Sequence, residues 1–322
     1  MPSGGWHRPL SFSGPLGIGF STAGSVVGVP RFDTISFLTD YGTADEFVGV
    51  VKSVVRDLAP HVVVIDLTHE IRPFDVRAGS LALARCIGYV PSGVVLAIVD
   101  PGVATDRRAV AIEVAGGNGV IVGPDNGLLA PAVAMAGGAE RAVVLTNRDY
   151  QLDAPGSTFA GRDVFAPAAA HLCNGVELTE LGTEVDPGLL LPATVPLPRE
   201  EGDSIVAEVL WVDRFGNAQL NVGPDDLPAS WGDHLQLRIA TPTDPQGPLV
   251  RRGVRSTNFA AITPGIVGLV LDSYGMLAVA LDQRSAADEL GLAAGDQVTL
   301  VPLDAPPVPD TPVSLGRRPP GQ

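Results

Sequence analysis

Two aspartates follow apolar, β-branched runs of the sequence, and both have the chemistry to bind a polar ligand. Asp40 ends the run TISFLTD, and Asp100 ends the run GVVLAIVD. The carboxylate of Asp40 can accept two hydrogen bonds from a ribose diol, and Arg107, seven residues after Asp100, can fold back and pair with it. Two alternatives stay open. Asp40 can be a turn residue that accepts hydrogen bonds from local backbone N–H groups, and Asp100 with Arg107 can be an ion pair that only supports the fold.

The stretch GSTFAGRDVFAP, residues 156–167, is typical of a loop that turns into a helix and presents side chains at the turn. Its centre is Ala160, whose methyl group offers no proton transfer and no hydrogen bond. The pattern is typical of a turn that takes part in chemistry, and the residues alone do not explain why the side chain at its centre is the least reactive one.

Two further motifs lie in the second half of the chain. In WVDRFGNAQLN, Asp213, Phe215 and Asn217 are interleaved with a glycine, and an aromatic face beside an amide can stack on a base and bind its edge. The alternative is a hairpin with one core aromatic. In LDSYGML, Ser273 and Tyr274 stand at a turn between two strands.

The elements that position the first motifs are strands alternating with helices. Apolar runs at 34–40, 62–67 and 93–100 predict strands, and the runs 43–58 and 75–90 between them have helical spacing. This alternation predicts an α/β domain with a mostly parallel sheet. In such a sheet the carboxyl ends of the strands line the ligand crevice, so Asp40 and Asp100 are expected there. Thr43 and Glu46 have the spacing of a capping box for the first helix.

The composition changes after residue 186, where DPGLLLPATVPLPREEGDS carries four prolines. After it, short strands with turn signals predict a small β-barrel or sandwich, and a barrel is the arrangement that we expect. We therefore expect a flexible extension at 1–31, an α/β sandwich domain at 32–190, a Pro-rich linker at 191–203, a C-terminal β-barrel domain at 204–304 and a disordered tail at 305–322.

Composition and charge argue against several classes of function. The net charge of −15 disfavours a nucleic-acid partner, because phosphate binding needs clustered Lys and Arg. No apolar run reaches the roughly 18 uncharged residues of a membrane span, and the five histidines show no metal-ligand spacing. Cys86 and Cys173 are the only cysteines, which favours a reducing cytoplasm. We expect a cytoplasmic protein that acts on a small molecule without a cofactor.

Together, these motifs resemble the family of S-adenosylmethionine (SAM) hydrolases that form adenosine, the SAM hydroxide adenosyltransferases, whose halide-using relatives are the fluorinases and chlorinases. The resemblance runs from about Phe32 to Leu303 and keeps the order of the motifs. It implies an N-terminal α/β domain, a C-terminal β-barrel, and a homotrimer that holds SAM between the N-domain of one subunit and the barrel of the next.

The resemblance also implies roles for the substrate-binding residues. Asp40 resembles the aspartate that holds both ribose hydroxyls. Residues that resemble the remaining substrate-binding set are the aromatics Phe74 and Phe159 near the ligand, Phe215, Asn217 and Phe259 at adenine, Asp213 and Ser273 at the methionine amino and carboxylate groups, and Tyr274, where relatives differ.

In the hydrolase branch of the family an Asp, an Arg and a His surround the nucleophilic water. Asp100 and Arg107 match the first two, and Ala160 stands where the His of the family motif TFHGRD belongs. The resemblance therefore implies SAM hydrolysis by water attack at ribose C5′, slowed by the missing imidazole. A nearby residue or a second water is expected to replace it, and His69 is one candidate.

Three alternatives to the hydrolase are weighed. A SAM or adenosine sensor that kept the pocket without the chemistry is favoured by Ala160 and disfavoured by Asp100 with Arg107. Halogenation is disfavoured, because Asp100 and Val103 stand where the halide pocket has a tyrosine and a threonine, and a halide needs donors to replace its lost water. A purely structural oligomer requires every motif to be a coincidental turn.

Overall fold

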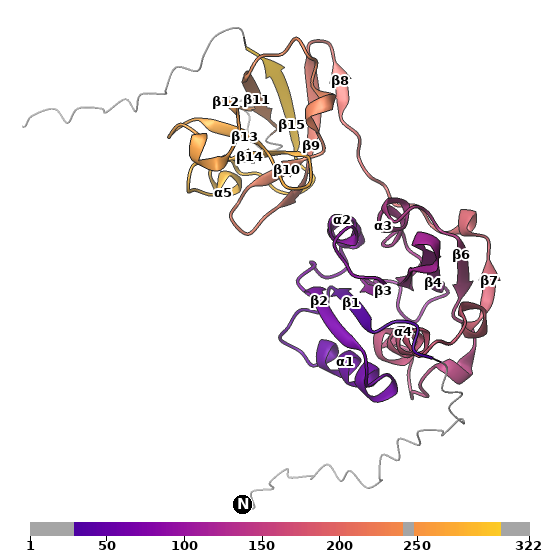
Figure 1. The fold of residues 1–322 in the computed structure, drawn as a ribbon. Coiled ribbons are helices and arrows are strands. Elements are labelled where there is room, and N and C mark those ends of the chain that lie inside the picture. The colour runs from indigo at the N-terminus through magenta and orange to yellow at the C-terminus, as the bar shows by residue number, and fades with distance from the viewer. Residues whose placement is uncertain (1–28, 241–247, 304–322) are drawn as a thin grey trace, which may run out of the picture.

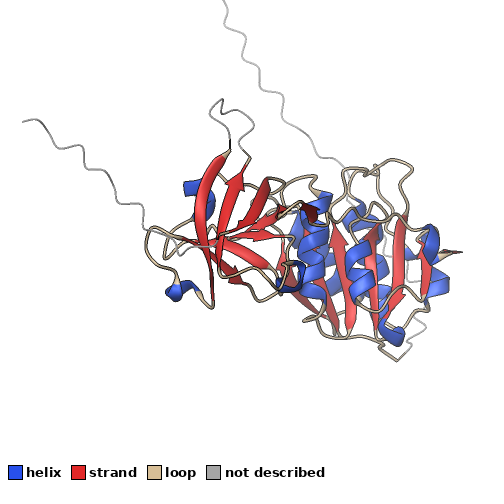
Figure 2. Cartoon of the chain, turned by 90° about the horizontal axis from the view of Figure 1, so that it is seen from above, coloured by secondary structure: helices blue, strands red, loops and turns tan. Residues whose placement is uncertain are grey.

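The computed structural model describes residues 29–240 and 248–303, which form two domains, each with its own sheet (Figure 1). The predicted extension lies outside the described residues except for its last three, and the predicted tail at 305–322 lies outside them entirely. The N-terminal domain combines helices and strands, whereas the C-terminal domain is almost all strand (Figure 2).

The N-terminal sheet has seven strands in the order β2-β1-β3-β5-β4-β6-β7. Neighbours among β2, β1, β3 and β5 are parallel, and those among β5, β4, β6 and β7 are antiparallel. The α/β class is confirmed, with the parallel strands gathered in one half of a mixed sheet. The strands are β1 (Thr34–Thr39), β2 (Val63–Thr68), β3 (Gly93–Ile98), β4 (Ala109–Val114), β5 (Gly119–Pro124), β6 (Arg141–Val144) and β7 (Thr183–Val185).

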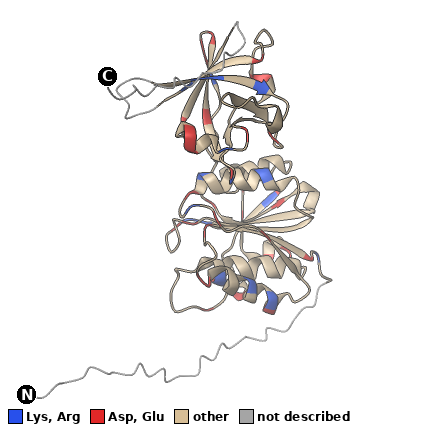
Figure 3. Ribbon diagram, turned by 90° about the vertical axis from the view of Figure 1, so that its left-hand side faces the viewer, with Lys and Arg blue, Asp and Glu red and all other residues tan. Residues whose placement is uncertain are grey.

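Helices cover both faces of this sheet (Figure 3). Every residue of β3 is buried, as expected for a parallel strand with both faces covered. Helix α1 (Phe47–Leu58) packs beside α4 (Ala166–Cys173) on one face, and α2 (Val76–Ile87) packs beside α3 (Ala130–Met135) on the other. Within the described ranges no helix has the length and apolarity to cross a bilayer.

The direction in which successive strands are added to the sheet reverses at β1. Strand β2 pairs with one edge of β1 and β3 with the other, with Leu38 opposite Ala97 and Thr39 opposite Ile98. Such a switch point leaves a crevice at the carboxyl ends of the two strands. Asp40 follows β1 directly, and Asp100 follows β3 after one intervening residue, so the fold brings both carboxylates to the same end of the sheet.

The start of α1 differs from the sequence prediction. The helix begins at Phe47, and its N-cap Glu46 makes no side-chain capping bond. The hydroxyl of Thr43 instead donates to Glu70 Oε1 at 3.2 Å. The predicted capping box is wrong, because a long-range partner after β2 takes the hydroxyl that would have capped the helix.

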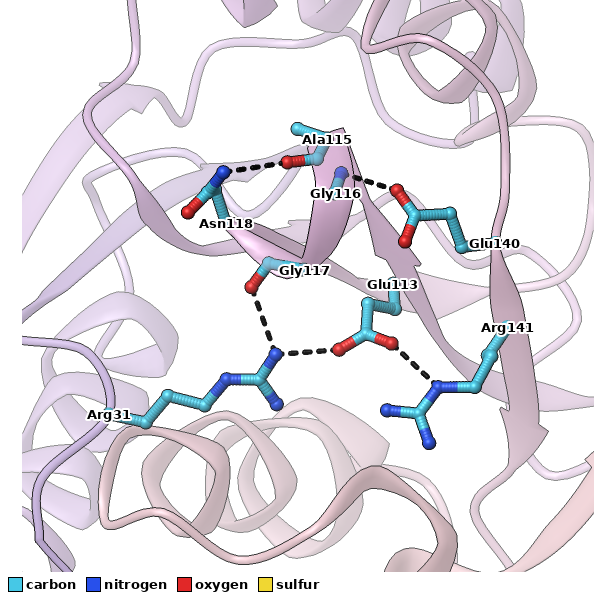
Figure 4. Close-up of polar contacts among 8 residues, drawn as sticks. All are labelled: Arg31, Glu113, Ala115, Gly116, Gly117, Asn118, Glu140 and Arg141. Atoms are coloured by element: carbon cyan, nitrogen blue, oxygen red, sulfur yellow. Dashed lines mark hydrogen bonds and ion pairs between the residues drawn. The ribbon is translucent and has the colours of Figure 1, made fainter.

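A buried carboxylate fastens the opposite end of the sheet (Figure 4). Glu113, near the end of β4, accepts hydrogen bonds from Arg31 Nη2 and Arg141 Nε, each at 2.6 Å, and Arg31 Nη2 also donates to the carbonyl of Gly117 at 2.9 Å. The bond from Arg141, against the effect of burial, lowers the pKa of Glu113. The network ties the segment before β1 to β4, β6 and the β4–β5 turn.

The C-terminal domain is a closed barrel. Seven strands close because β9 pairs with both β15 and β10, and β8 adds to the outer edge of β9. Strand β8 lies within the stretch predicted as linker. The strands are β8 (Arg199–Glu201), β9 (Ser204–Val212), β10 (Ala218–Leu220), β11 (His234–Ile239), β12 (Leu249–Ser256), β13 (Val267–Leu271), β14 (Leu277–Ala280) and β15 (Gln297–Pro302), with helix α5 (Ala286–Leu290) beside them.

Helix α2 joins the two domains, because it contacts the sheet on one side and the barrel on the other (Figure 1). Arg77 Nη2 lies 2.5 Å from Glu208 Oε1 of β9. The guanidinium of Arg85 lies 4.2 Å from the ring centre of Trp211 and 5.8 Å from that of Tyr274.

Strand β2 is an edge strand with little cover. Val63 is 62% exposed and Ile65 is 40% exposed. Asp66 of the same strand accepts a hydrogen bond from Lys52 Nζ of α1 at 2.9 Å. An apolar strand edge therefore carries one charged pair.

The packing around β3 gives a first prediction. Leu96, in the middle of β3, is fully buried. Leu96→Ala is expected to lower the free energy of unfolding by about 2–5 kcal/mol, through lost burial and the cavity left behind. Chemical denaturation measures this change in the free energy of unfolding. The matched control is Met135→Ala, which truncates a side chain that is 65% exposed and should change stability by roughly 0.5 kcal/mol or less. Equal losses in both variants would contradict this account of the core.

Candidate active site

Asp100 and Arg107 form a nearly buried ion pair at the carboxyl end of β3. Arg107 Nε lies 2.8 Å from Oδ1 and 2.9 Å from Oδ2 of Asp100, and Arg107 Nη2 lies 2.5 Å from Oδ2. The side chains are only 6% and 15% exposed, respectively. The predicted fold-back of Arg107 is confirmed, and its fork holds the carboxylate in a fixed plane.

The turn after β3 makes this pairing possible. The N–H of Val103 donates to the carbonyl of Asp100 at 3.2 Å, which closes the turn. A Cβ at Gly102 would come within 3.1 Å of Arg107 Cγ, so glycine leaves room for the returning side chain. The guanidinium then lies 5.1 Å from the ring centre of Phe165. A cation over an aromatic face adds to the attraction that holds Arg107 in place.

Asp40 is held by the backbone of Phe74. Asp40 Oδ2 accepts a hydrogen bond from the Phe74 N–H at 2.9 Å. Phe74 adopts φ 69°, a left-handed conformation that costs a non-glycine residue free energy, and its ring is 72% exposed. Burial raises the pKa of Asp40, and the charge of Asp100 adds to the rise, while the Phe74 N–H opposes it. Two carboxylates therefore share one crevice, next to an exposed aromatic ring.

Tyr41 is a residue that the motif analysis missed. Its ring lies 5.6 Å from the ring of Phe47 and 6.0 Å from that of Phe159, which themselves are 5.0 Å apart. Burial, and then the charges of Asp40 and Asp100, raise the pKa of Tyr41 far above its usual range. The hydroxyl is therefore protonated at neutral pH. Its position directly after Asp40, at a strand end, is the signal that was available in the sequence.

The turn around Ala160 meets Tyr41. Ala160 is buried and precedes a π-helical turn, Gly161–Phe165, that continues into α4. Local π-helical turns are frequent at functional sites. A Cβ at Gly161 would collide with the Tyr41 hydroxyl, so glycine is required there. Arg162 pairs with its neighbour Asp163, with Nε to Oδ1 at 2.6 Å.

The imidazole of His69 contacts residues of β1 and β2. Its Nδ1 lies 2.9 Å from Thr39 Oγ1, and its ring packs 4.9 Å from that of Phe37. Its Nε2 is 3.2 Å from Asp66 Oδ1, although the angles do not make this a hydrogen bond. No contact joins His69 to Asp100 or Arg107 in the part of the chain that the structure describes. The structure therefore gives no support to His69 as the replacement for the imidazole.

In the barrel, Asp213 organises the hairpin turn between β9 and β10. Its Oδ1 accepts from the N–H groups of Phe215 and Asn217 at 2.8 and 2.9 Å, and its Oδ2 accepts from Asn217 Nδ2 at 2.8 Å. This bonding leaves the ring of Phe215 77% exposed. The alternative of a core aromatic does not hold, because Phe215 faces outward.

Ser273 and Tyr274 lie in a second turn, between β13 and β14. The turn is held by Asp272, whose Oδ1 accepts from the Tyr274 N–H at 2.8 Å and whose Oδ2 accepts from Gln219 of β10 at 2.5 Å. Ser273 is exposed, and Tyr274 is 42% exposed. Phe259, 46% exposed, begins a short helical turn after β12.

Within one chain, the predicted residues gather in two separate groups. Contacts and electrostatic coupling join the first group, Asp40, Phe74, Asp100, Arg107 and Phe159, and Tyr41 lies among them. Across residues 29–240 and 248–303, no hydrogen bond or ring contact connects this group to the barrel residues Asp213, Phe215, Asn217, Phe259 and Ser273. No three His, Cys, Asp or Glu side chains in the described ranges gather as a metal site would need.

The comparisons with known proteins agree with this architecture. Models of the SAM hydroxide adenosyltransferase N-terminal and C-terminal domains match residues 35–182 and 207–299. The chain is 46% identical over 267 residues to the "(R)-S-adenosyl-L-methionine hydrolase" of Salinispora tropica, covering 82% of this chain and 96% of that protein. It is 41% identical over 275 residues to the protein of the same name from Thermus thermophilus, covering 83% and 99%. A solved structure of an uncharacterized conserved protein from Thermotoga maritima aligns with TM-score 0.74 and 32% identity, covering 83% of this chain and 99% of that one.

The raised pKa of Asp40 gives a second prediction. A carboxyl whose folded pKa is raised stabilises the fold when protonated, and this contribution is lost as the pH rises through the folded pKa. Asp40→Asn removes the buried charge and keeps an acceptor for the Phe74 N–H. The variant is expected to melt at a higher temperature than the parent at pH 7, and the gain should shrink as the pH is lowered toward the ordinary aspartate value of 3.8.

Asp66→Asn is the matched control, and its melting temperature at pH 7 is expected to change in the opposite direction. Burial opposes ionisation of Asp66, but the hydrogen bond from Lys52 and the proximity of His69 lower its pKa overall. Its stabilisation is present at neutral pH and is lost as the pH falls, so Asp66→Asn should lower the melting temperature at pH 7. A lower melting temperature for Asp40→Asn at pH 7 would contradict the assignment of Asp40 as a desolvated carboxylate.

Proposed function

The chain belongs to the SAM hydroxide adenosyltransferase family, and from that premise we propose that it hydrolyses SAM to adenosine and L-methionine by attack of water at ribose C5′. The observation that carries this proposal is the Asp100–Arg107 fork beside Asp40 at the carboxyl ends of adjacent parallel strands. Relatives that align over more than four-fifths of the chain are named for this activity.

The reaction is an in-line displacement. The water oxygen forms a bond to C5′ while the bond from C5′ to the sulfonium sulfur breaks, and its electron pair stays on sulfur as neutral methionine leaves. The water loses one proton. Because the sulfonium is already a good leaving group, the protein needs to position the water, exclude other nucleophiles and accept that proton.

The residues of the N-terminal group divide these tasks. Asp40 accepts hydrogen bonds from the ribose hydroxyls and so fixes C5′ above the strand ends. Asp100 accepts a hydrogen bond from the attacking water and receives its proton. Arg107 holds the Asp100 carboxylate in one plane, because both oxygens are engaged by its fork.

The missing imidazole slows this reaction without abolishing it. A positioned general base contributes about 10²–10⁴-fold, and binding, orientation and Asp100 remain. A SAM-binding protein without catalytic activity is less well supported, because binding alone gives no role to the nearly buried Asp100–Arg107 pair. Halogenation is disfavoured by the Asp100 carboxylate and by the apolar Val103, which packs against the core.

In this proposal the substrate-binding site is completed by residues of a neighbouring subunit. Phe215, Asn217 and Phe259 would hold adenine, and Asp213, Ser273 and Tyr274 the methionine part, from the barrel of a neighbouring chain in a homotrimer. The exposed rings of Phe215 and Phe259, which do not meet the N-terminal group of their own chain, support this arrangement. Phe74 and Phe159 would line the ribose side. The reaction needs no cofactor, and the free Cys86 and Cys173 support a cytoplasmic location.

Incubation with SAM tests the activity directly. The purified parent is expected to release adenosine and methionine in equal amounts, above a protein-free control, in a chromatographic time course. Asp100→Asn is expected to lower the rate by about 10²-fold or more, because the proton acceptor is lost. Ala160→His serves as the comparison variant. If only Ala160→His releases adenosine, the parent is a binding protein and the proposal fails.

Mixed oligomers test the shared site. Asp100→Asn and Phe215→Ala are each expected to lose most activity. When the two variants are dissociated and reassembled together, random mixing places an intact N-terminal group against an intact barrel in about a quarter of cross-subunit sites. Recovery to about a quarter of parental activity is expected. A site built within one chain would show no recovery, since every chain carries one defect.

A further inference from the structure

The phenol of Tyr41 packs against the turn around Ala160, where the family's imidazole is missing. We propose that the Tyr41 hydroxyl occupies the place of the missing side chain and donates a hydrogen bond to the attacking water, holding it against Asp100. This assignment rests on the proposed hydrolysis and names a residue that contacts the reacting water.

The position of Tyr41 is fixed from both sides. The residue follows Asp40 at the end of β1, so its backbone belongs to the crevice. Its hydroxyl reaches Gly161, immediately after Ala160, closely enough that no Cβ is tolerated there. Residues far apart in the chain therefore place an oxygen beside the active-site turn, one residue after the methyl group of Ala160.

The ring is held rigidly while its hydroxyl keeps its hydrogen-bonding capacity. Phe47 and Phe159 pack on the Tyr41 ring at 5.6 and 6.0 Å, and they contact each other. The Tyr41 side chain is partly buried, and across residues 29–240 and 248–303 its hydroxyl forms no hydrogen bond. The hydroxyl is therefore free to bond a polar partner from outside the protein, such as a water.

The charges around Tyr41 decide what the hydroxyl can do. Burial and the carboxylates of Asp40 and Asp100 hold its pKa far above neutrality, against the opposing charge of Arg107. The hydroxyl is thus a proton donor in a hydrogen bond, and it does not act as the base. The charges of Asp40, Asp100 and Arg107 all act on this hydroxyl.

The donor completes the bonding of the water. A water molecule has two protons and two lone pairs. One lone pair must point at C5′ and one proton at Asp100, so the second lone pair needs a donor. Tyr41 supplies it, and the same bond passes to the 5′-hydroxyl of adenosine after the proton moves to Asp100. This role fixes orientation, and so it acts on kcat more than on KM.

Tyr41→Phe tests the role, because it removes one oxygen and keeps the stacked ring. With the parent active on SAM, the variant is expected to lose about 10–100-fold in kcat with KM changed by less than about threefold. Its melting temperature is expected to stay near the parental value. The matched control is Tyr150→Phe, which removes a phenol that donates to Glu180 on the surface of the same domain.

The double variant Tyr41→Phe/Ala160→His tests whether the two side chains serve one position. Restoring an imidazole is expected to recover at least about tenfold in kcat over Tyr41→Phe. The recovered activity should fall as the pH drops through about 6.5, where an imidazole gains its proton. The parent, which uses a phenol, should show no such loss. A phenol that serves a different position would lower kcat by the same factor in the Ala160→His background as in the parent, whereas a shared position predicts a much smaller loss in that background.

Several outcomes overturn the inference. If Tyr41→Phe keeps more than half of the parental kcat while the parent hydrolyses SAM, Tyr41 has no role in the reaction and the proposed function stands. If its kcat falls together with its melting temperature, the phenol is structural. If Ala160→His fails to restore Tyr41→Phe, the two do not share a position. If the parent releases no adenosine, the proposed function and this inference both fail.

Discussion

The site depends on keeping an ionised Asp100–Arg107 pair nearly out of water at the end of a buried strand. Removing one member of such a pair leaves an unpaired charge and typically costs about 3–5 kcal/mol. The structure meets this demand with several independent contacts: a fork of three short N–O distances, a glycine that makes room for the returning side chain, and the ring of Phe165 beneath the guanidinium. The surrounding turns are therefore constrained by this pair.

The two domains share one arrangement. In each domain an aspartate carboxylate holds a turn through hydrogen bonds to its backbone, and an aromatic ring of that turn faces outward. Asp40 engages the backbone of Phe74, and Asp213 engages the backbone of Phe215. The rings, 72% and 77% exposed, are costly on a free surface and reasonable on a surface that receives a ligand or another subunit. Rigid turns with exposed rings present binding surfaces that are already formed, which reduces the ordering cost of binding.

Residues at strand ends were predictable because hydrophobic periodicity locates the strand and parallel order fixes which end carries function. Asp40, Asp100 and Arg107 were found in this way. Contacts between distant segments were not predictable. The hydroxyl of Thr43 bonds Glu70 instead of capping α1, and His69 turns toward Thr39. The role of Tyr41 depends on Gly161, from a segment 120 residues away in the chain, and no local pattern records that meeting.

The edge of the N-terminal sheet shows how a fold with an exposed apolar strand avoids unwanted assembly. A bare strand edge is a template for pairing with another chain, and Val63 and Ile65 make β2 apolar as well. Asp66, bonded to Lys52, places a charge within that edge. A second strand laid along β2 would meet this charged pair, which disfavours strand addition at that edge.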